Sequence, residues 1–378
     1  MRKIKPKELK KNILLLMSII LIMLLLFEGF FRLFNPQLTY EQAIISSPSV
    51  FAKSDYLPWQ LKPFASDVHI SQFDEFRVNV TINSLGMRDY ERNIPKKGVK
   101  RILTLGDSFT YGYGVELNES YPKILEQELN KNQDGQKYIV LNAGYASGYS
   151  PDTYYLYLKK EGLKLQPDII MVGFTTNNDV VDLFKNRVIE GNGSAKIVSD
   201  SYYVDEDDRL RVPSYNKQSG LNVFLSTHSH FFIFIKNSIG EILQKQYGKN
   251  DVYKVEYDEG LKEKWGEVEK LLVKMNKLAE ENNAKLIVAL IPRKAQVYDR
   301  YWEVYKNTHG DYEVDRTKPQ KLLMNMCNKT SIRCIDLLPA FKEEAKEEFY
   351  FEKDGHWTKY GHRFAAEYLK EYILKETS

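Results

Sequence analysis

From residue 101 onward, short apolar runs alternate with longer amphipathic stretches, and this pattern limits the fold more than any other feature of the chain. Short buried strands that alternate with helices predict a parallel sheet covered by helices on both faces. In such a sheet, binding sites form beyond the carboxyl ends of the strands. The expected strands are Ile102–Leu105, Tyr138–Leu141, Asp168–Phe174, Lys285–Ile291 and Ile332–Leu337, and the expected helices are Tyr121–Asn130, Pro151–Leu163, Leu261–Asn282 and Lys359–Leu374.

The first 34 residues predict a membrane anchor. An apolar run without charged residues, containing Ser18, extends from Ile13 to Phe27 and continues with interruptions to Phe34, which gives the ~20 residues that a membrane span needs. Bulky residues follow it where a cleaved signal peptide would have small ones. Glu28 and Arg32, spaced i,i+4, are expected to pair near the outer interface. Six basic residues precede the run: Arg2, Lys3, Lys5, Lys7, Lys10 and Lys11.

Basic residues that flank a span stay on the cytoplasmic side, so the rest of the chain is expected outside the membrane. We therefore expect a cytoplasmic tail at residues 1–11, a signal anchor at 12–34, and a stalk with a small extended region at 35–98. The main domain follows at 99–376. The alternative for the N-terminal run is a buried helix of a soluble protein.

Residues 183–258 interrupt the alternation of strands and helices. This stretch contains a polar segment and then an apolar, helix-like run from Leu221 to Leu243. It is too long for a plain connection, so we interpret it as a lid or a substrate-facing insertion.

Composition excludes some functions and leaves others open. The net charge of +3 is too small and too evenly spread for a nucleic-acid-binding protein. Cys327 and Cys334 are either a disulfide that joins a helix end to the next strand or two unrelated buried thiols. His228 and His230 have no carboxylate or cysteine partner nearby and are interpreted as packing or capping residues, so no metal is expected.

Two short motifs carry the chemistry. Gly106-Asp107-Ser108 follows the first expected strand, so the Ser108 hydroxyl lies where a helix begins. Asp354-Gly355-His356 precedes the last expected helix. Gly355 predicts a tight loop in which the Asp354 carboxylate reaches Nδ1 of His356. A serine, a histidine base and an orienting carboxylate are the groups that nucleophilic acyl transfer requires.

Two further loops offer donors for a developing oxyanion. Gly148 lies in the loop after the second expected strand and can approach a ligand closely, although Gly144 is an alternative for this role. Asn178 follows the third strand and offers a side-chain amide. Asp107 is expected to shape the serine turn, and His362 is the second candidate for the base.

These residues, Gly106-Asp107-Ser108, Gly148, Asn178 and Asp354-x-His356, resemble in type and order the four blocks of the SGNH (GDSL) hydrolase superfamily. The resemblance covers residues 99–376. It implies a flavodoxin-like three-layer α/β/α fold with a five-stranded parallel sheet. It also implies Ser108 as nucleophile, His356 as base, Asp354 as its orienting acid, and an oxyanion hole formed by Ser108 N–H, Gly148 N–H and the Asn178 side chain.

The chain departs from the family pattern at two places. Thr176 replaces the glycine of the third block, and one residue instead of two separates Asp354 from His356. The shorter spacing is similar to that of membrane-tethered and periplasmic SGNH proteins that act on acetyl groups of exopolysaccharides. The resemblance thus implies a serine esterase for acylated envelope glycans or small esters, which needs no cofactor. The alternatives are an O-acetyltransferase with the same triad and a non-catalytic glycan-binding scaffold.

Overall fold

The computed structural model describes residues 6–37, 39, 48–92, 98–131, 135–191, 194–200, 202–211, 220–236, 238, 251–309 and 311–377. The chain divides into two compact units. The anchor unit comprises Met1–Ile45 and Ser214–Gln246, and the α/β unit comprises Ser46–Pro213 and Tyr247–Ser378.

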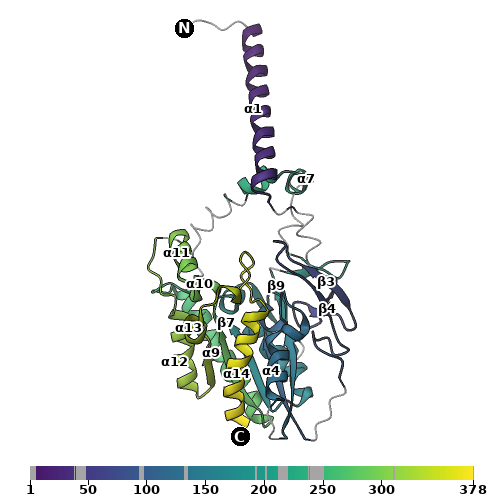
Figure 1. The fold of residues 1–378 in the computed structure, drawn as a ribbon, viewed down its shortest axis with the longest axis vertical. Helices are drawn as coiled ribbons and strands as arrows, with labels where there is room; N and C mark the ends of the chain where they lie inside the picture. The colour runs from purple at the N-terminus through teal and green to yellow at the C-terminus, as the bar shows by residue number, and fades with distance from the viewer. Residues whose placement is uncertain are drawn as a thin grey trace. The chain divides into compact units, whose positions relative to one another are not determined.

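A five-stranded sheet forms the centre of the α/β unit (Figure 1). Its strand order is β13-β12-β7-β5-β6, and every neighbouring pair is parallel. The prediction of an α/β fold with a five-stranded parallel sheet is therefore confirmed. Each expected strand overlaps an observed one, and Lys285–Ile291 has the same bounds as β12. The strands are β5 (Val99–Gly106), β6 (Lys137–Gly144), β7 (Ile169–Thr175), β12 (Lys285–Ile291) and β13 (Arg333–Asp336).

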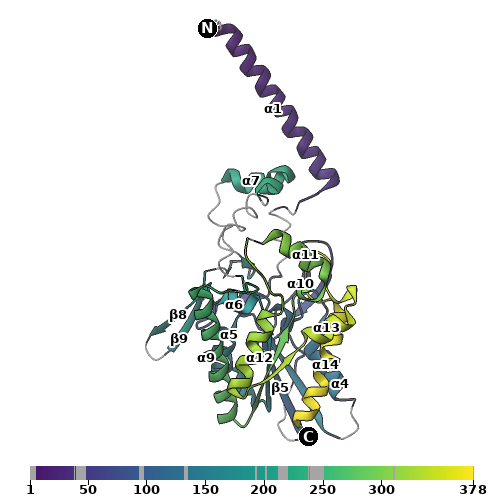
Figure 2. The same cartoon turned by 90° about the vertical axis from the view of Figure 1, so that its left-hand side faces the viewer.

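Helices cover both faces of this sheet, and the alternation of side chains along each strand explains why. Ile102 packs into the core on one face and Leu103 into the core on the other, because successive strand residues point to opposite faces. On the Ile102 face lie α4 (Tyr121–Leu129), α13 (Leu338–Glu344) and α14 (Lys359–Thr377). On the Leu103 face lie α5 (Pro151–Lys160), α9 (Glu259–Glu281) and α12 (Lys318–Thr330), which Figure 2 shows side by side.

Residues 48–92, expected as a stalk and a small extended region, belong to the α/β unit. They form two hairpins, and Phe51 and Trp59 are buried in the same core as Leu103. In the sequence, Pro95 and Gly98 also indicate a hinge before the main domain, but of these positions only Gly98 is among the described residues. The strands are β1 (Phe51–Ala52), β2 (Gln60–Leu61), β3 (Ser66–Ile70) and β4 (Arg77–Thr81).

Two buried charges attach this N-terminal segment to the sheet domain. The guanidinium of Arg88 is fully buried and donates to the carbonyl oxygens of Tyr111 (3.1 Å) and Val115 (2.7 Å). Asp89 accepts from the buried ammonium of Lys123 at 2.6 Å. Removing either partner of such a pair leaves an uncompensated charge, so the contacts hold the segment in one place.

The expected insertion at 183–258 is divided between the two units. Its first part follows α6 (Asn178–Asp182) and forms two short hairpins in the α/β unit. The helix expected from Leu221 starts as α7 (Gly220–His228), and residues 230–236 are helical again after a break at Ser229. Of the rest of the expected helix, residues 237–243, only residue 238 is among the described residues. The hairpin strands are β8 (Asn186–Gly191), β9 (Ser194–Ser199), β10 (Tyr203–Val204) and β11 (Leu210–Arg211).

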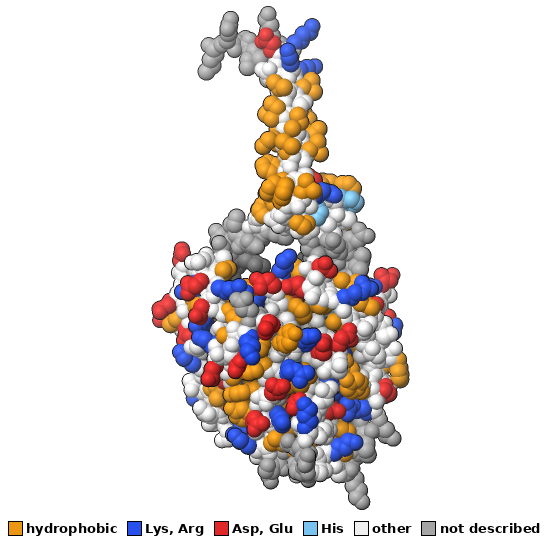
Figure 3. Space-filling view, viewed as in Figure 1, with side chains coloured by type: hydrophobic (Ala, Val, Ile, Leu, Met, Phe, Trp, Pro, Cys, Tyr) orange, Lys and Arg blue, Asp and Glu red, His pale blue; other side chains and the backbone are white. Residues whose placement is uncertain are grey.

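In the anchor unit, α1 (Pro6–Phe34) contains a 25-residue stretch, Lys10–Phe34, that is long and apolar enough to span a membrane. Figure 3 shows hydrophobic side chains covering this helix, whereas positive and negative side chains intermingle on the visible face of the α/β unit. The expected pair of Glu28 and Arg32 is present at 2.7 Å.

A disulfide joins Cys327 at the end of α12 to Cys334 on β13, with the Cα atoms 6.1 Å apart. Of the two alternatives for these cysteines, a disulfide or two unrelated thiols, the structure shows the disulfide.

Two buried histidines predict a loss of stability in acid. Burial and the charge of Arg88 lower the pKa of His69 and of His362 to about 3. An unfolded histidine titrates near ~6.5. Between these values the unfolded chain binds protons that the folded chain does not. The free energy of unfolding should therefore fall as the pH decreases below ~6.5, by up to about 1.4 kcal/mol per pH unit for each histidine.

We expect His362→Asn, which keeps an acceptor for the Tyr121 N–H, to flatten this pH dependence. Urea denaturation at several pH values between 7 and 4.5, followed by tryptophan fluorescence, measures it, because all four tryptophans lie in the α/β unit. Identical slopes for the variant and the wild type would show that His362 does not contribute.

Candidate active site

Ser108 lies at the turn between β5 and the short helix α3 (Ser108–Tyr111). The side chain of Asp107 accepts a hydrogen bond from the backbone N–H of Phe109 at 3.0 Å and so caps this helix. Asp107 shapes the turn, as the sequence predicts. Burial raises the pKa of its carboxyl.

A continuous hydrogen-bonded chain connects the two predicted motifs. Ser108 Oγ lies 2.7 Å from Nε2 of His356, and Nδ1 of His356 bonds Oδ1 of Asp354. Ser108 and His356 are 248 residues apart in the chain, so the fold itself brings them together. If Nδ1 carries the proton that faces Asp354, then Nε2 is free to accept the Ser108 proton.

The Asp354–His356 loop is closed by contacts within itself. Gly355 has a φ of +81°, a left-handed conformation that glycine adopts without strain. The backbone N–H of His356 also donates to Asp354 Oδ1 at 3.2 Å. Burial acts to raise the pKa of Asp354, but the hydrogen bonds and charge of His356 outweigh it, and the net pKa is lowered. The carboxylate is therefore ionised at neutral pH.

Glu75, in the turn between β3 and β4, holds the same loop from outside. Its two carboxylate oxygens accept from the backbone N–H groups of Lys353 (2.9 Å) and Asp354 (2.8 Å). Sequence reasoning missed this residue, because a turn glutamate 279 residues away from its partner carries no local signal.

Aromatic rings surround the imidazole. The ring of Tyr113 lies 4.4 Å from that of His356, centroid to centroid, and the ring of Phe109 lies 5.0 Å away. Trp357, fully buried, contacts Phe109 at 5.0 Å and attaches the histidine loop to the core.

The structure gives the two candidate glycines different environments. At Gly144 a Cβ atom would lie 2.3 Å from the backbone nitrogen of Tyr111, so this glycine permits close packing of β6 against α3. Gly148 has a φ of +68°, and a Cβ there would meet the ring of Tyr202 at 2.6 Å. Close packing thus accounts for Gly144 without an oxyanion role.

Asn178 is held at the end of β7 by two partners. Its Nδ2 donates to Asp107 Oδ2 at 3.2 Å, and its Oδ1 accepts from Nη1 of Arg293 at 3.0 Å. One of its two amide hydrogens is thus directed to the serine turn, and the other remains for a ligand. Arg293, two residues after the end of β12, orients this amide.

The other histidines weighed as candidates lie elsewhere. His362 is fully buried, and its Nδ1 accepts from the backbone N–H of Tyr121 at 3.2 Å. His230 Nδ1 accepts from the backbone N–H of Gln37, and His228 Nδ1 bonds the carbonyl of Phe224, both within the anchor unit.

Glu75 supplies a test of how strictly the loop must be positioned. Glu75→Ala removes both bonds to the loop backbone, and a misplacement of about 1 Å costs about 100-fold in rate. We expect kcat for ester hydrolysis to fall between about 10- and 100-fold with little change in KM. Glu75→Gln, which keeps one acceptor oxygen, should recover part of the loss. Equal kcat for Glu75→Ala and the wild type would mean that the loop needs no support.

A parallel sheet with a serine turn after β5 and an Asp-x-His loop before the last helix is the arrangement of SGNH (GDSL) hydrolase-like proteins. Residues 251–378 match the family described as the SGNH hydrolase-like domain of acetyltransferase AlgX. This match includes Asp354 and His356, and the serine turn precedes it. Over residues 251–378 the chain is thus similar to an SGNH hydrolase-like domain, a domain of the hydrolase or acyl-transfer kind.

Solved structures with a similar arrangement include three esterases or lipases. The acetyl xylan esterase AlAXEase is 14% identical, with a TM-score of 0.39 over 72% of this chain and 98% of its own. A lipase/acylhydrolase from Enterococcus faecalis is 13% identical, with a TM-score of 0.38 over 74% and 97%. A variant of Axe2, an acetyl-xylooligosaccharide esterase from Geobacillus, is 12% identical, with a TM-score of 0.40 over 73% and 95%. No curated protein matches the chain.

Proposed function

We propose that this protein is a serine-dependent ester hydrolase that acts outside the cytoplasmic membrane on acylated envelope glycans or small esters. The observation that carries the proposal is the hydrogen-bonded chain from Ser108 Oγ through both nitrogens of His356 to Asp354. A serine hydroxyl is a weak nucleophile unless a base accepts its proton during attack, and this geometry provides that base.

In the first half of the reaction, Ser108 Oγ attacks the ester carbonyl carbon while Nε2 of His356 accepts the hydroxyl proton. The ionised Asp354 stabilises the imidazolium that forms. The negative charge on the carbonyl oxygen would be stabilised by the N–H groups of Ser108 and Gly148 and by the Asn178 amide. His356 then gives the proton to the leaving alkoxide, which departs as an alcohol and leaves an acyl group on Ser108.

In the second half, water attacks the acyl-enzyme and His356 accepts one of its protons. The tetrahedral intermediate collapses, the acid leaves, and the proton returns to Ser108 Oγ. These steps use the named side chains, the backbone N–H groups of Ser108 and Gly148, and water.

The second candidate is an O-acetyltransferase, in which a sugar hydroxyl replaces water in this last attack. The observation that favours it is the match of residues 251–378 to a domain described by an acetyltransferase. The two reactions share every residue named above and differ only in the acceptor.

The proposed location rests on α1. Its Lys10–Phe34 stretch would cross the membrane, and the basic residues before it would keep the N-terminus in the cytoplasm. The α/β unit would then face the extracytoplasmic side. We propose no nucleic-acid partner, since the net charge of +3 offers no basis for one.

Product analysis tests the proposal. Full-length protein in detergent is incubated with an acetylated oligosaccharide, with and without an unacetylated acceptor, and the products are resolved by mass spectrometry. Free acetate with an unmodified acceptor supports hydrolysis, and an acetylated acceptor supports transfer. Neither product with any acetylated glycan or small ester would indicate a non-catalytic, glycan-binding scaffold.

A further inference from the structure

The loop that carries His356 is closed at its base by backbone contacts. Tyr350 and Trp357 form an antiparallel bridge, and the backbone N–H of Phe351 donates to the carbonyl oxygen of His356 at 2.9 Å. Backbone N–H and carbonyl groups that are removed from water need partners, and these contacts use only some of the groups in the loop. The others must be paired with side chains from elsewhere in the chain.

Lys294 pairs two of these groups from the side of the sheet. It is the first residue of α10 (Lys294–Val297), three residues after the end of β12. Its side chain is largely buried, and its ammonium donates to the carbonyl oxygens of Phe351 (3.0 Å) and Glu352 (2.6 Å). Nζ also lies 3.8 Å from the centroid of the Tyr301 ring. Because a buried ammonium is costly unless its donors are satisfied, these contacts hold the side chain in one place.

Glu75 pairs the next two residues of the loop with the opposite charge. Its carboxylate accepts from the backbone N–H groups of Lys353 and Asp354. Burial lowers the pKa of Lys294, and the opposing charges of Glu352 and Glu75 only partly offset this. Glu75 is therefore close enough for its charge to act on Lys294. Four consecutive residues, 351–354, are thus held by an ammonium on their first two carbonyls and a carboxylate on their last two N–H groups.

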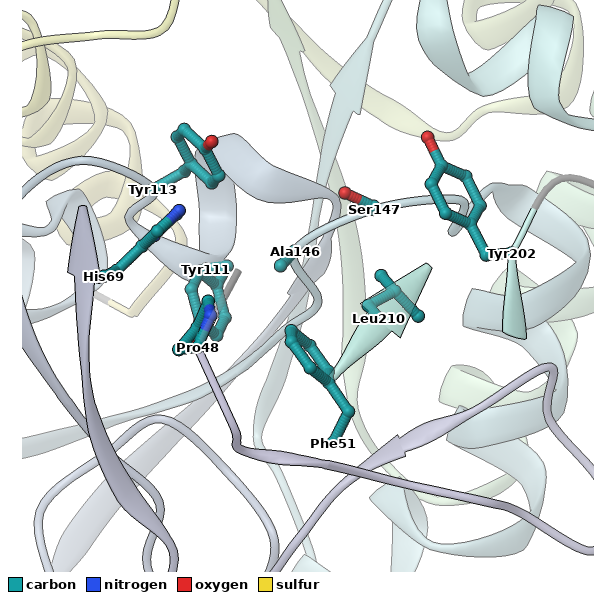
Figure 4. A pocket seen from close by; sticks show the side chains of 9 residues that line it. All are labelled: Pro48, Phe51, His69, Tyr111, Tyr113, Ala146, Ser147, Tyr202 and Leu210. Atoms are coloured by element: carbon teal, nitrogen blue, oxygen red, sulfur yellow. The ribbon is translucent and has the colours of Figure 1, made fainter. Parts of the chain in front are cut away.

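The imidazole of His356 is supported separately, through its ring. Tyr113 packs on this ring, and His69 of β3 packs on Tyr113 with a centroid distance of 4.4 Å. Figure 4 shows His69 and Tyr113 beside each other, where they line a pocket of about 130 Å³ in the α/β unit. These aromatic contacts act on the ring, whereas Glu75 and Lys294 act on the backbone that leads to it.

We propose that Lys294 is a positioning residue for the reaction, and that Lys294 and Glu75 together form one clamp on the loop that carries Asp354 and His356. The inference rests on the proposed function of the triad and adds a residue that acts through the backbone. Release of either side of the clamp would let Nε2 of His356 move away from Ser108 Oγ, which now lies 2.7 Å from it. A displaced base slows proton transfer without weakening the binding of the ester.

Lys294→Met tests the clamp, because methionine keeps an unbranched apolar side chain and removes the donors. We expect kcat on p-nitrophenyl acetate to fall about 10- to 100-fold, with KM within about twofold of the wild type. The matched control is Lys318→Met. Lys318 also donates to a backbone carbonyl, that of Val255, and its ammonium lies 4.6 Å from the ring of Tyr257. This control should keep the wild-type kcat.

Two further measurements separate positioning from a general loss of stability. Propylammonium supplies the atoms that Lys294→Ala lacks, so it should restore kcat of this variant, whereas propanol should not. In the double variant Glu75→Ala/Lys294→Met, kcat should fall by much less than the product of the two single losses, because either change alone frees the same loop. Losses that multiply in full, together with no rescue by propylammonium, would overturn the clamp.

NMR of the His356 ring protons separates failure of this inference from failure of the proposed function. Full-length protein with isotope-labelled histidine is used, and the signals are assigned with His356→Gln. Their shifts depend on the neighbouring Tyr113 ring and require no hydrolysis. Signals that move in Lys294→Met but not in Lys318→Met, in a protein that hydrolyses no ester, would support the clamp and overturn the esterase. Unchanged signals and a wild-type kcat in Lys294→Met would overturn the clamp and leave the esterase standing.

Discussion

Ser108→Ala is expected to lower kcat for ester hydrolysis by about 10⁴- to 10⁶-fold. The change removes the atom that would form the acyl-enzyme and leaves the turn intact, because Asp107 caps α3 through Phe109 without the serine hydroxyl. The residual rate should come from the oxyanion donors and substrate binding alone. Steady-state rates on p-nitrophenyl acetate measure it.

The matched control is Ser84→Ala, an exposed serine that bonds Glu91 and lies away from the triad. It should retain the wild-type rate. Thermal unfolding of both variants separates chemistry from stability. A Ser108→Ala protein that folds normally and hydrolyses at the wild-type rate would refute the serine mechanism.

Asp354→Asn is expected to lower kcat by about 10⁴-fold, although the change removes only a charge. The present carboxylate accepts from Nδ1 of His356 and so keeps the proton on that nitrogen. An amide in its place can donate to Nδ1, which moves the imidazole proton to Nε2. Nε2 would then face Ser108 Oγ as a donor and could no longer accept its proton.

Asp299→Asn, an exposed aspartate paired with Arg316, is the control for an Asp-to-Asn change and should leave the rate unaltered. The NMR signal of the His356 ring protons in the variant reports the tautomer directly. A rate within tenfold of the wild type would mean that Asp354 does not orient the base.

The sequence predicts the sheet well because each strand is recognisable from its own short apolar run. Lys285–Ile291 is an unbroken apolar run after one lysine. Its short length and apolar composition are typical of a strand buried on both faces. Helix α12 is implied in the sequence only by the disulfide alternative for Cys327, since its polar residues make the buried face, which includes Leu323 and Cys327, hard to recognise. The Asp354–His356 contact was predictable because Gly355 permits the tight left-handed turn that brings the two side chains together.

Long-range partners that belong to no recognisable motif could not be predicted. Glu75 and His69 belong to the β3–β4 hairpin, and Arg88 follows that hairpin. Their roles exist only because this segment packs against the serine turn and the histidine loop. The same limit applies to the insertion. The sequence shows its apolar run. It does not show that the Glu28 carboxylate accepts from the backbone N–H of His230 and so caps the helix that begins there.

Covalent trapping of Ser108 tests the central claim most directly. A fluorophosphonate probe reacts when an activated serine oxygen displaces fluoride from phosphorus, and mass spectrometry of the digested protein locates the adduct. We predict a single adduct on the peptide containing Ser108 in the folded wild type, none in Ser108→Ala, and much slower labelling in His356→Ala. An adduct on another serine, or no adduct in folded protein that hydrolyses esters, would contradict the account.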